Sequence, residues 1–390
     1  MAVDTSPTVP AGAPGSGTAQ PVGRKQAADE PRVFVASQWQ LIWWKFRKHK
    51  LGLISAGVVA FVYFVALFVE PIAPFLPDNF NSKFTYAPPQ AIRLFSEGRF
   101  VGPYVYGLKQ EIEPEAMRRI FKPDPNQIIP LGFFIHGEPY KMWGFIVSDI
   151  HVFGPKNKGD FVFFVGADRV GRDVYSRIIY GTRVSMSIGL VGVFLSFILG
   201  LTLGGISGYY GGWIDNLIQR MIEFLRSMPT IPLWMGLAAA IPVTWPPERV
   251  YFAITIILSL IGWTGLARVV RGRFLSLREE DFVMAARLDA VSEFRIIMRH
   301  MVPSFSSHII AAITLAIPAM ILAETALSFL GLGLQPPVVS WGVLLQEAQN
   351  VRAVATAPWL LSPALAVMLT VLALNFLGDG LRDAADPYGR

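Results

Sequence analysis

The sequence is poor in cysteine and in charge. Cysteine is absent from its 390 residues, and Asp, Glu, Lys and Arg together make up only 16%. The absence of cysteine excludes disulfide bonds, zinc thiolate sites and thiol catalysis. Hydrophobic residues make up 53% of the chain and the mean hydropathy is +0.45, which is too apolar for an ordinary soluble domain of this length. The composition therefore predicts a polytopic membrane protein.

Several catalytic signatures are also missing. The sequence has no GxxxxGK[ST] phosphate loop, no HExxH and no GxSxG, and no lysine occurs from residue 160 onward. These absences exclude ATP binding by a phosphate loop and the hydrolase sites that the other motifs build. We therefore expect no enzymatic activity and no cofactor in this chain. Mid-span ionisable residues, which proton- or sodium-driven carriers use, are scarce because Glu324 and Asp379 lie near the ends of apolar segments. Any energy for transport is expected to come from another subunit.

Two further kinds of site are disfavoured. The net charge is +6, but the arginines cluster beside apolar segments and form no single basic face with interleaved aromatics, so we expect no nucleic-acid partner. His136 and His151, with Glu138 and Asp149 nearby, suggest a metal site at first sight. Their irregular spacing fits no ligand pattern, and the sequence therefore predicts no metal site.

Six apolar segments are long enough to cross a bilayer, which needs about 20 residues. The cations Lys45, Arg47, Lys48 and Lys50 precede the first segment and predict that its amino end is cytoplasmic. Counting alternate crossings places both termini and the basic loop after the fourth segment on the cytoplasmic side. The predicted transmembrane helices cover residues 51–69, 186–208, 221–241, 250–266, 305–323 and 359–377.

The amino-terminal region divides into two parts. Residues 1–35 are rich in Pro, Gly, Ala and Ser, which predicts a disordered cytoplasmic tail. Residues 37–50 are typical of an amphipathic helix lying among lipid headgroups. Its apolar face is formed by Trp39, Ile42, Trp43 and Phe46.

A long stretch separates the first two predicted transmembrane helices. Residues 70–183 contain the β-favouring runs GFIVSDIHVF and FVFFVGA, which predict an external α/β or β-containing insertion instead of a loose loop. After the last predicted helix, residues 378–390 are expected to form a cytoplasmic tail.

The second apolar segment contains regularly spaced glycines, and the third contains two prolines. Gly200, Gly204 and Gly208 recur every four residues, a pattern that allows two helix backbones to approach closely in lipid. We interpret this stripe as a helix-packing seam, with a flexible hinge as the alternative. In the third segment, Pro229 and Pro232 predict a kink.

The 268–300 loop carries seven arginines from Arg268 to Arg299, interleaved with apolar residues at helical spacing. This spacing predicts a basic amphipathic helix pair at the membrane surface. Contact with lipid headgroups alone would account for the arginines but not for the small pair Ala285 and Ala286. A partner protein is therefore the favoured ligand of this loop.

Four stretches together resemble one protein family. They are VGADRVGRDVYSRIIYGTRVSMSIGL, VMAARLDAVSEFRIIMRHMVPS, ETALSFLGLGLQPPVVSWGVLL and LNFLGDGLRDAADP. With these stretches in this order, from about residue 37 to the end, the chain resembles a C-type permease subunit of the dipeptide, oligopeptide and nickel ATP-binding-cassette importers. The resemblance implies an all-α polytopic fold of six transmembrane helices, of the type I importer class, in the bacterial cytoplasmic membrane. It also implies three kinds of partner besides membrane lipid: a second related permease, two ATP-binding subunits and an external or periplasmic solute-binding protein.

The resemblance also implies a docking helix. In this family an EAAxxxG motif forms a coupling helix that inserts into the ATPase, and by position the Glu falls on Met284 and the Gly on Ala290. Losing the carboxylate removes a contact of about 1.5–3 kcal/mol. Replacing Gly by Ala favours helix by about 1 kcal/mol, which predicts a more regular turn after Leu288. The implied docking residues are Met284, Ala285, Ala286, Arg287, Ala290, Phe294 and Arg295.

Three functional hypotheses follow. The leading one is half of the translocation pathway of an ATP-driven importer for peptides or similar small polar solutes. A membrane sensor with an external ligand-binding segment is the alternative, motivated by the long stretch 70–183. A third, an ion-coupled carrier acting alone, is disfavoured by the scarcity of mid-membrane charge.

Overall fold

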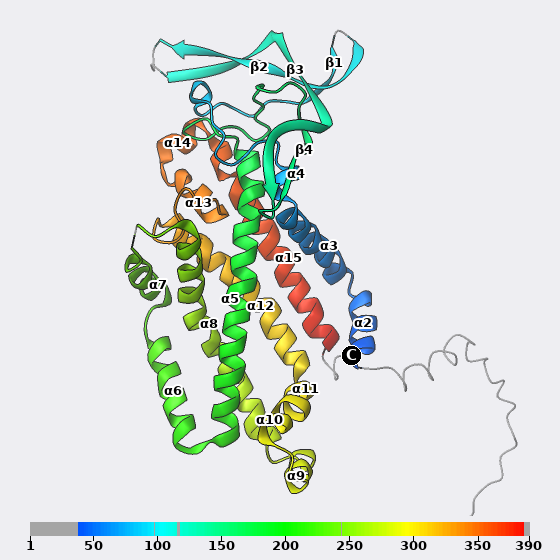
Figure 1. The fold of residues 1–390 in the computed structure, drawn as a ribbon, viewed down its shortest axis with the longest axis vertical. Coiled ribbons are helices and arrows are strands. Elements are labelled where there is room, and N and C mark those ends of the chain that lie inside the picture. The colour runs from blue at the N-terminus through cyan, green and yellow to red at the C-terminus, as the bar shows by residue number, and fades with distance from the viewer. Residues whose placement is uncertain (1–37, 97, 115–117, 243, 386–390) are drawn as a thin grey trace, which may run out of the picture.

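The structure is a computed structural model that describes residues 38–96, 98–114, 118–242 and 244–385. The predicted disordered tail, residues 1–35, lies outside the described residues. Figure 1 shows an elongated helical bundle with a β-sheet at one end and a short helical loop at the opposite end. We call these the sheet end and the loop end.

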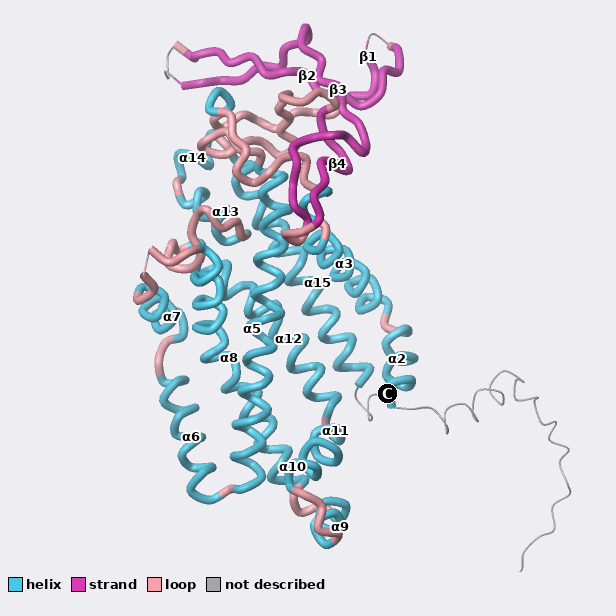
Figure 2. Tube along the Cα trace, in the orientation of Figure 1, coloured by secondary structure: helices cyan, strands magenta, loops and turns pink. Residues whose placement is uncertain are grey.

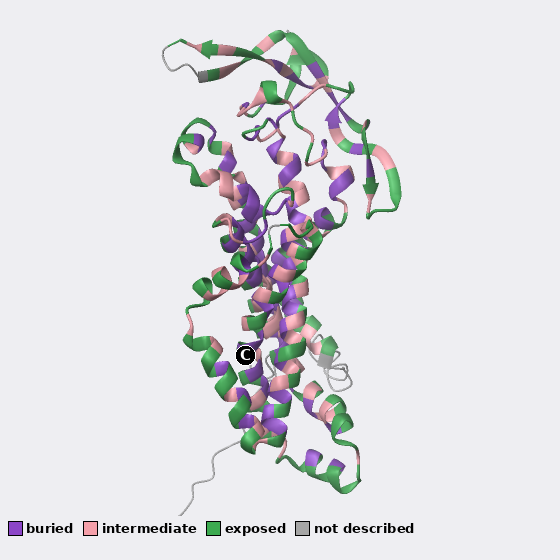
Figure 3. Ribbon diagram, turned by 60° about the vertical axis from the view of Figure 1, so that its left-hand side comes forward, coloured by how far each residue is buried: buried purple, intermediate pink, exposed green. Residues whose placement is uncertain are grey.

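Five helices of the described residues are long and apolar enough to cross a membrane. The helices α5 and α8 pack along each other, α12 packs on α15, and α15 packs on α3. Figure 3 shows that buried residues follow the axis of this bundle while exposed ones cover its outside. The bounds are Lys50–Leu67 for α3, Val174–Tyr210 for α5, Pro247–Leu277 for α8, Ser306–Phe329 for α12 and Ser362–Ala385 for α15.

The third predicted transmembrane helix, 221–241, is wrong as a continuous helix. The structure divides it into α6, Gly212–Ser227, and α7, Thr230–Ala239. Met228 and Pro229 between them are extended, with ψ of 139° and 123°. A residue before proline is disfavoured in helical geometry, so the predicted kink becomes a complete break. Neither part is long enough to cross a membrane alone.

Three predicted boundaries also need correction, because the helices extend beyond the apolar segments. The helix α5 begins at Val174, inside the predicted insertion 70–183; α8 continues to Leu277, inside the predicted loop 268–300; and α15 reaches Ala385, inside the predicted tail 378–390. At about 1.5 Å per residue, a helix of 37 residues spans about 55 Å, well beyond the roughly 30 Å hydrocarbon core. Hydropathy marks only the part in lipid.

A four-stranded antiparallel sheet lies between α4 and α5 in the chain, with strand order β1-β2-β3-β4. Figure 2 shows the long strand β3 pairing with β2 along one part and with β4 along another. A small apolar core beneath the sheet contains Val105, Ile129, Leu131 and Val162. The bounds are Arg93–Ser96 for β1, Arg99–Glu113 for β2, Arg118–Met142 for β3 and Ile146–Pro155 for β4.

The chain before α3 forms the helix α2, Gln38–Lys48, within the predicted interfacial stretch 37–50. Trp39 and Trp43 are exposed while Phe46 is buried, and α2 packs against α15. The remaining short helices are α4 Val69–Ile72, η1 Ser82–Phe84, α9 Asp281–Leu288, α10 Glu293–Ile296, the π-helix η2 Ile297–Met301, α11 Val302–Ser304, α13 Trp341–Gln346, η3 Glu347–Gln349, α14 Val351–Thr356 and η4 Pro358–Leu361.

The three glycines of the predicted seam face α8. A Cβ added at Gly204 would lie 2.5 Å from the carbonyl oxygen of Ala267, and one at Gly208 would lie 2.6 Å from that of Arg271. At Gly200 the nearest atom belongs to the side chain of Leu266, at 2.9 Å. These distances are too short for any side chain, so close backbone approach between α5 and α8 depends on glycine here.

Candidate functional site

The loop end is built by α9, α10, η2 and α11, which connect α8 to α12 (Figure 1). The helix α9 is seated by two buried side chains, Val283 and Ala286. They join an apolar cluster that includes Tyr209 of α5 and Phe274 of α8. Because both of these helices cross the membrane, α9 is attached directly to spanning elements.

The outer side of this loop is apolar and exposed. Leu288 is 87% exposed and Phe294 is 75% exposed. Several large apolar side chains exposed on one short loop make it a candidate protein interface. We call this set the end patch, and its members are Phe282, Met284, Leu288, Phe294 and Met298.

The implied docking residues do not all face outward. Met284, Ala285 and Phe294 are exposed, but Ala286 is buried against the bundle. Adjacent residues on an α-helix point about 100° apart, so Ala285 is exposed while Ala286 is buried on a helix that lies on its own bundle. Ala286 therefore faces the bundle in this structure, and its contact with a partner stays a prediction. Its small side chain lets α9 seat closely.

Two polar contacts brace the loop against the end of α5. The guanidinium of Arg287 lies over the ring of Tyr209, 5.0 Å from its centroid. The hydroxyl of Tyr210 donates to Glu293 Oε2 at 2.8 Å. Arg287 thus contacts its own bundle, although it is exposed, as Arg295 is. Both contacts connect the loop to a membrane-spanning helix.

The turn after α9 differs from the prediction. Ala290 has φ of +55°, so the helix ends in a left-handed residue and the expected more regular turn is wrong. The amide of Ala290 donates to Arg287 O and that of Val291 to Ala286 O, the bond pattern of a Schellman C-cap. This cap needs positive φ, which glycine adopts without cost. This left-handed conformation explains the Gly at the end of the implied EAAxxxG motif. Ala290 adopts the same conformation at a cost in strain.

A charged cluster supports the loop end from the side. Asp215 of α6 accepts from Arg271 of α8 through Nε and Nη2, both at 2.5 Å. Ser207 of α5 donates to the same carboxylate at 2.5 Å. The hydrogen bond from Arg271, followed by that from Ser207, holds the pKa of Asp215 below its ordinary value against the opposing effect of burial. Three helices are joined here by one carboxylate.

Sequence reasoning missed a second polar cluster, at the sheet end. Asp168, Arg172 and Arg177 come from the VGADRVGRDVYSR stretch, which we used only for the resemblance. They lie near Glu347 of η3, whose Oε1 is 3.9 Å from Arg172 Nη2. Burial, and next the charge of Asp168, raise the pKa of Glu347. A polar cavity of about 480 Å³ opens beside the cluster. The alternation of Asp and Arg in this stretch is the sequence feature that indicates such an ion-pair cluster.

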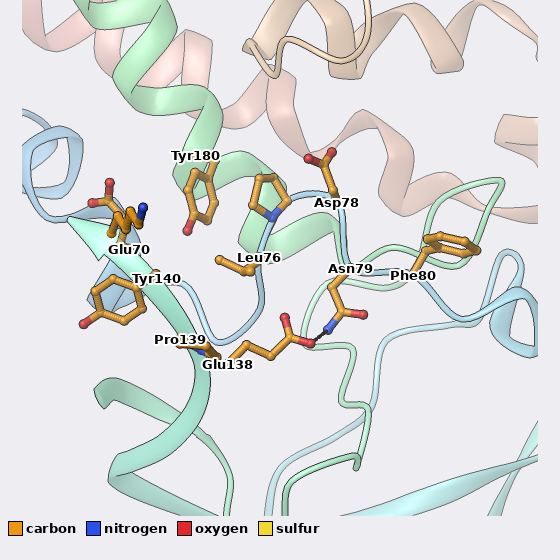
Figure 4. Close-up of a pocket in the computed structure, with 11 residues that line it drawn as sticks. Glu70, Leu76, Asp78, Asn79, Phe80, Glu138, Pro139, Tyr140 and Tyr180 are labelled. Atoms are coloured by element: carbon orange, nitrogen blue, oxygen red, sulfur yellow. Dashed lines mark hydrogen bonds between the residues drawn. The ribbon is translucent and has the colours of Figure 1, made fainter. Parts of the chain in front are cut away.

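A second hollow, of about 610 Å³, lies between the sheet and the bundle. Figure 4 shows residues that line it, among them Tyr180 of α5 and Tyr140 of β3. Asn79 Nδ2 donates to Glu138 Oε1 at 2.8 Å across its rim. Its lining joins the segment after α4 to the sheet.

The two histidines considered for a metal site have other roles. His151 is buried, with Nδ1 2.6 Å from Ala73 O and Nε2 3.1 Å from Glu138 O. His136 Nδ1 lies 3.1 Å from Asp149 Oδ1 at the surface. Within the described residues, no group of three or more potential metal ligands occurs.

Comparisons with known proteins match most of the described chain. Residues 200–388 match the family described as binding-protein-dependent transport system inner membrane component. Residues 37–89 match the N-terminal TM domain of oligopeptide transport permease C. The strands β1 to β4 lie between these two matched stretches.

Individual relatives agree with the family match. The chain is 38% identical to the dipeptide transport system permease protein DppC of Bacillus subtilis over 224 residues, 57% of this chain and 68% of that one. It is 42% identical to the oligopeptide transport system permease protein OppC of Haemophilus influenzae over 228 residues, 58% and 71% of the two chains. A solved structure of the MetNI methionine ABC transporter in inward-facing conformation aligns with a TM-score of 0.43 and 17% identity, covering 54% of this chain and 96% of that one.

Proposed function

Because this chain belongs to the inner-membrane components of binding-protein-dependent transport systems, as a C-type dipeptide/oligopeptide permease, we propose that it forms half of the translocation pathway of an ATP-driven peptide importer and receives mechanical work at its loop end. The relatives are permease components, which are not themselves enzymes. The proposal assigns ATP hydrolysis to separate partner subunits.

One observation supports the coupling role: α9, which carries Phe282, Met284 and Leu288 of the end patch, shares an apolar cluster with α5 and α8. Leu288 and Phe294 are exposed, while Val283 on the opposite face of α9 is fully buried in the apolar cluster with Tyr209 and Phe274. A partner that binds the exposed face of α9 therefore acts on α5 and α8 through the buried face of the same helix. A partner shifts a conformational equilibrium only through contacts that differ between the two states, and the proposal assigns those contacts to this loop.

The same proposal orients the molecule. The loop end carries Arg295 and Arg299 between two spanning helices, and short loops rich in Arg and Lys stay in the cytoplasm. We therefore place the end patch and both chain termini in the cytoplasm of a bacterial inner membrane, and the sheet on the outside. The partners are a second related permease, two ATP-binding subunits and an external solute-binding protein.

Peptides are the proposed solute class because the relatives carry dipeptide and oligopeptide transport in their names. The sensor hypothesis is not pursued, since the chain belongs to a permease family.

The coupling role is tested by replacing Leu288 with Asp in the complete complex, reconstituted in lipid vesicles. The matched control is Val351→Asp, since Val351 is 81% exposed but lies in α14 at the sheet end (Figure 1). An apolar anchor at an interface contributes about 2 kcal/mol or more, so L288D is expected to lower peptide uptake and binding-protein-stimulated ATPase activity by about tenfold or more. The control should retain both.

Equal activity of L288D and V351D would contradict the coupling role. A second variant, Ala285→Glu, guards against a misfolded loop, because Ala285 is exposed and its substitution leaves the buried contacts of α9 intact. Assembly of the variants with the ATPase subunits is measured by co-purification. Loss of ATPase binding together with an unchanged melting temperature of the permease supports the proposal.

A further inference from the structure

The turn between β3 and β4 reaches the sheet-end terminus of the first membrane-spanning helix. The indole Nε1 of Trp143 donates to the carbonyl oxygen of Leu67 at 2.8 Å, and Leu67 is the last residue of α3. The Trp143 ring also packs against Phe68, with centroids 5.7 Å apart. Figure 2 shows this turn descending from the sheet to the end of α3. The hairpin is therefore fixed at the level where α3 ends.

The turn exposes an unusual amount of apolar surface. Phe145 is 72% exposed and Val147 is 68% exposed. We call residues 143–147 the hairpin tip. The adjoining end of α3 exposes Phe64 and Leu67, so the apolar surface of the tip continues that of the helix. Because α3 crosses the membrane, its exposed apolar side chains at this level face lipid.

Charged groups mark the depth of this surface. Arg183 of α5 forms a two-point ion pair with Glu70 of α4, both distances being 2.6 Å. Its guanidinium also donates to the carbonyls of Ala66 and Leu67. Ionised side chains beside a spanning helix lie near the water boundary of the bilayer, and tryptophan is enriched at the same level because its ring is apolar and its N–H is polar. The hairpin tip and the Arg183–Glu70 ion pair thus both indicate the same depth, the lipid–water boundary at the sheet end.

Exposed apolar side chains also occur elsewhere on the sheet, so exposure alone does not identify this turn as a lipid contact. Phe95 and Phe100 are also exposed, but their rings pack on each other across the β1–β2 hairpin, 5.6 Å apart. Figure 2 shows β1 in the upper part of the sheet, away from the end of α3. What distinguishes the hairpin tip is its direct hydrogen bond to a spanning helix.

We propose that the hairpin tip inserts into the lipid interface at the sheet end, so that the sheet is anchored to the bilayer as well as to the bundle. The occupant of the exposed surface is lipid, by continuity with the lipid-facing side of α3. Phe145 and Val147 enter the acyl boundary while Trp143 stays at headgroup depth. This inference requires only that α3 crosses the membrane and is independent of the transported solute.

The absence of cysteine from the chain allows a clean test. A single cysteine is introduced as Phe145→Cys, and the full chain, with its partner subunits, is labelled with a nitroxide in vesicles of phosphatidylethanolamine and phosphatidylglycerol. Collision with oxygen, which concentrates in lipid, is compared with collision with a water-soluble nickel chelate. The control is Val101→Cys, because Val101 is also exposed but lies on β2.

The expected result is an oxygen-to-nickel accessibility ratio several-fold higher at residue 145 than at residue 101. Equal ratios at the two positions overturn the proposal, since the tip is then in water. Exclusion of both reagents at residue 145 also overturns it, because a protein partner then covers the tip. Val147→Cys repeats the measurement in case the first variant folds poorly.

Discussion

Arg177 and Asp168 form an ion pair 2.5 Å long in which each side chain is only 3% exposed. Asp168 also accepts from Arg172 Nε at 2.6 Å and from the amide of Val170 at 2.9 Å. One carboxylate therefore closes the loop that leads from the sheet region into α5. The loop also depends on Gly171, whose φ is +85° and whose added Cβ would lie 2.0 Å from Asn81 O.

The first prediction concerns this pair. Asp168→Asn keeps the shape of the side chain but leaves the buried Arg177 without its counter-charge. Removing one partner of a buried ion pair costs about 3–5 kcal/mol, so the melting temperature of the purified protein should fall clearly. The control is Glu223→Gln, which removes a partner of the exposed pair with Arg220 and should cost at most about 1 kcal/mol. Equal melting temperatures for the two variants would show that the buried pair contributes nothing.

The second prediction concerns the end of α9. Ala290 holds φ of +55°, a conformation that costs a non-glycine residue about 1–2 kcal/mol. Ala290→Gly is therefore expected to slow hydrogen exchange at the amides of Ala290 and Val291, because the capping bonds form without strain. Ala285→Gly, at an exposed position within the helix, should act in the opposite direction by about 1 kcal/mol. Faster exchange at Val291 in A290G would contradict the strained cap.

The third prediction concerns the seam between α5 and α8. Gly204→Ala places a methyl group 2.5 Å from the carbonyl oxygen of Ala267 and should destabilise the protein by about 1–3 kcal/mol through overpacking. Gly272→Ala on α8 is the matched control, because its added Cβ meets none of the described atoms within 4 Å. Thermal unfolding in detergent measures both variants. A melting temperature of G204A at or above that of G272A would favour a hinge over a packing seam.

The fourth prediction concerns pH. Asp173 caps α5 by accepting from the amide of Ser176 at 2.8 Å, and burial raises its pKa to about 7, with hydrogen bonds from Ser176 opposing that rise. A raised carboxyl pKa means that the folded state binds the proton more tightly than the unfolded state. The free energy of unfolding therefore increases as pH falls from about 7 toward about 4.

Asp173→Asn cannot titrate and should lose this contribution. Melting temperatures of both proteins are compared at about pH 8 and about pH 5. The difference, wild type minus variant, is expected to shift in favour of the wild type at the lower pH. A difference that stays constant would place the pKa of Asp173 near its ordinary value.

Helix 221–241 illustrates the limit of reading helices from hydropathy. The apolar run was long enough to cross the membrane, and the proline positions were visible, but whether a proline bends or breaks a helix depends on whether neighbouring groups satisfy the freed carbonyls. In the structure the chain extends at Met228 and Pro229. At α5, α8 and α15 the helices extend beyond the apolar segments, which the length of an apolar run does not indicate.

The residues 281–288 illustrate the same limit at the site. Helical spacing predicted an amphipathic helix, and the structure has α9 there. Which face of α9 is buried depends on the apolar cluster that Val283 and Ala286 share with Tyr209 of α5, a residue distant in the chain. No local pattern contains this cluster, so the sequence alone does not indicate that Ala286 faces the bundle.

By itself, the sequence determined the membrane class, the existence of the five long apolar helices and the family, because these follow from composition, run length and short motifs. Only the tertiary structure decided which side of α9 is exposed, how Asp168 and Arg177 pair, and that Trp143 reaches Leu67. These three facts depend on elements that are distant in the chain but adjacent in space. Periodicity along a chain fixes a helix and its faces, whereas the neighbour that each face meets is set by the packing of the whole bundle.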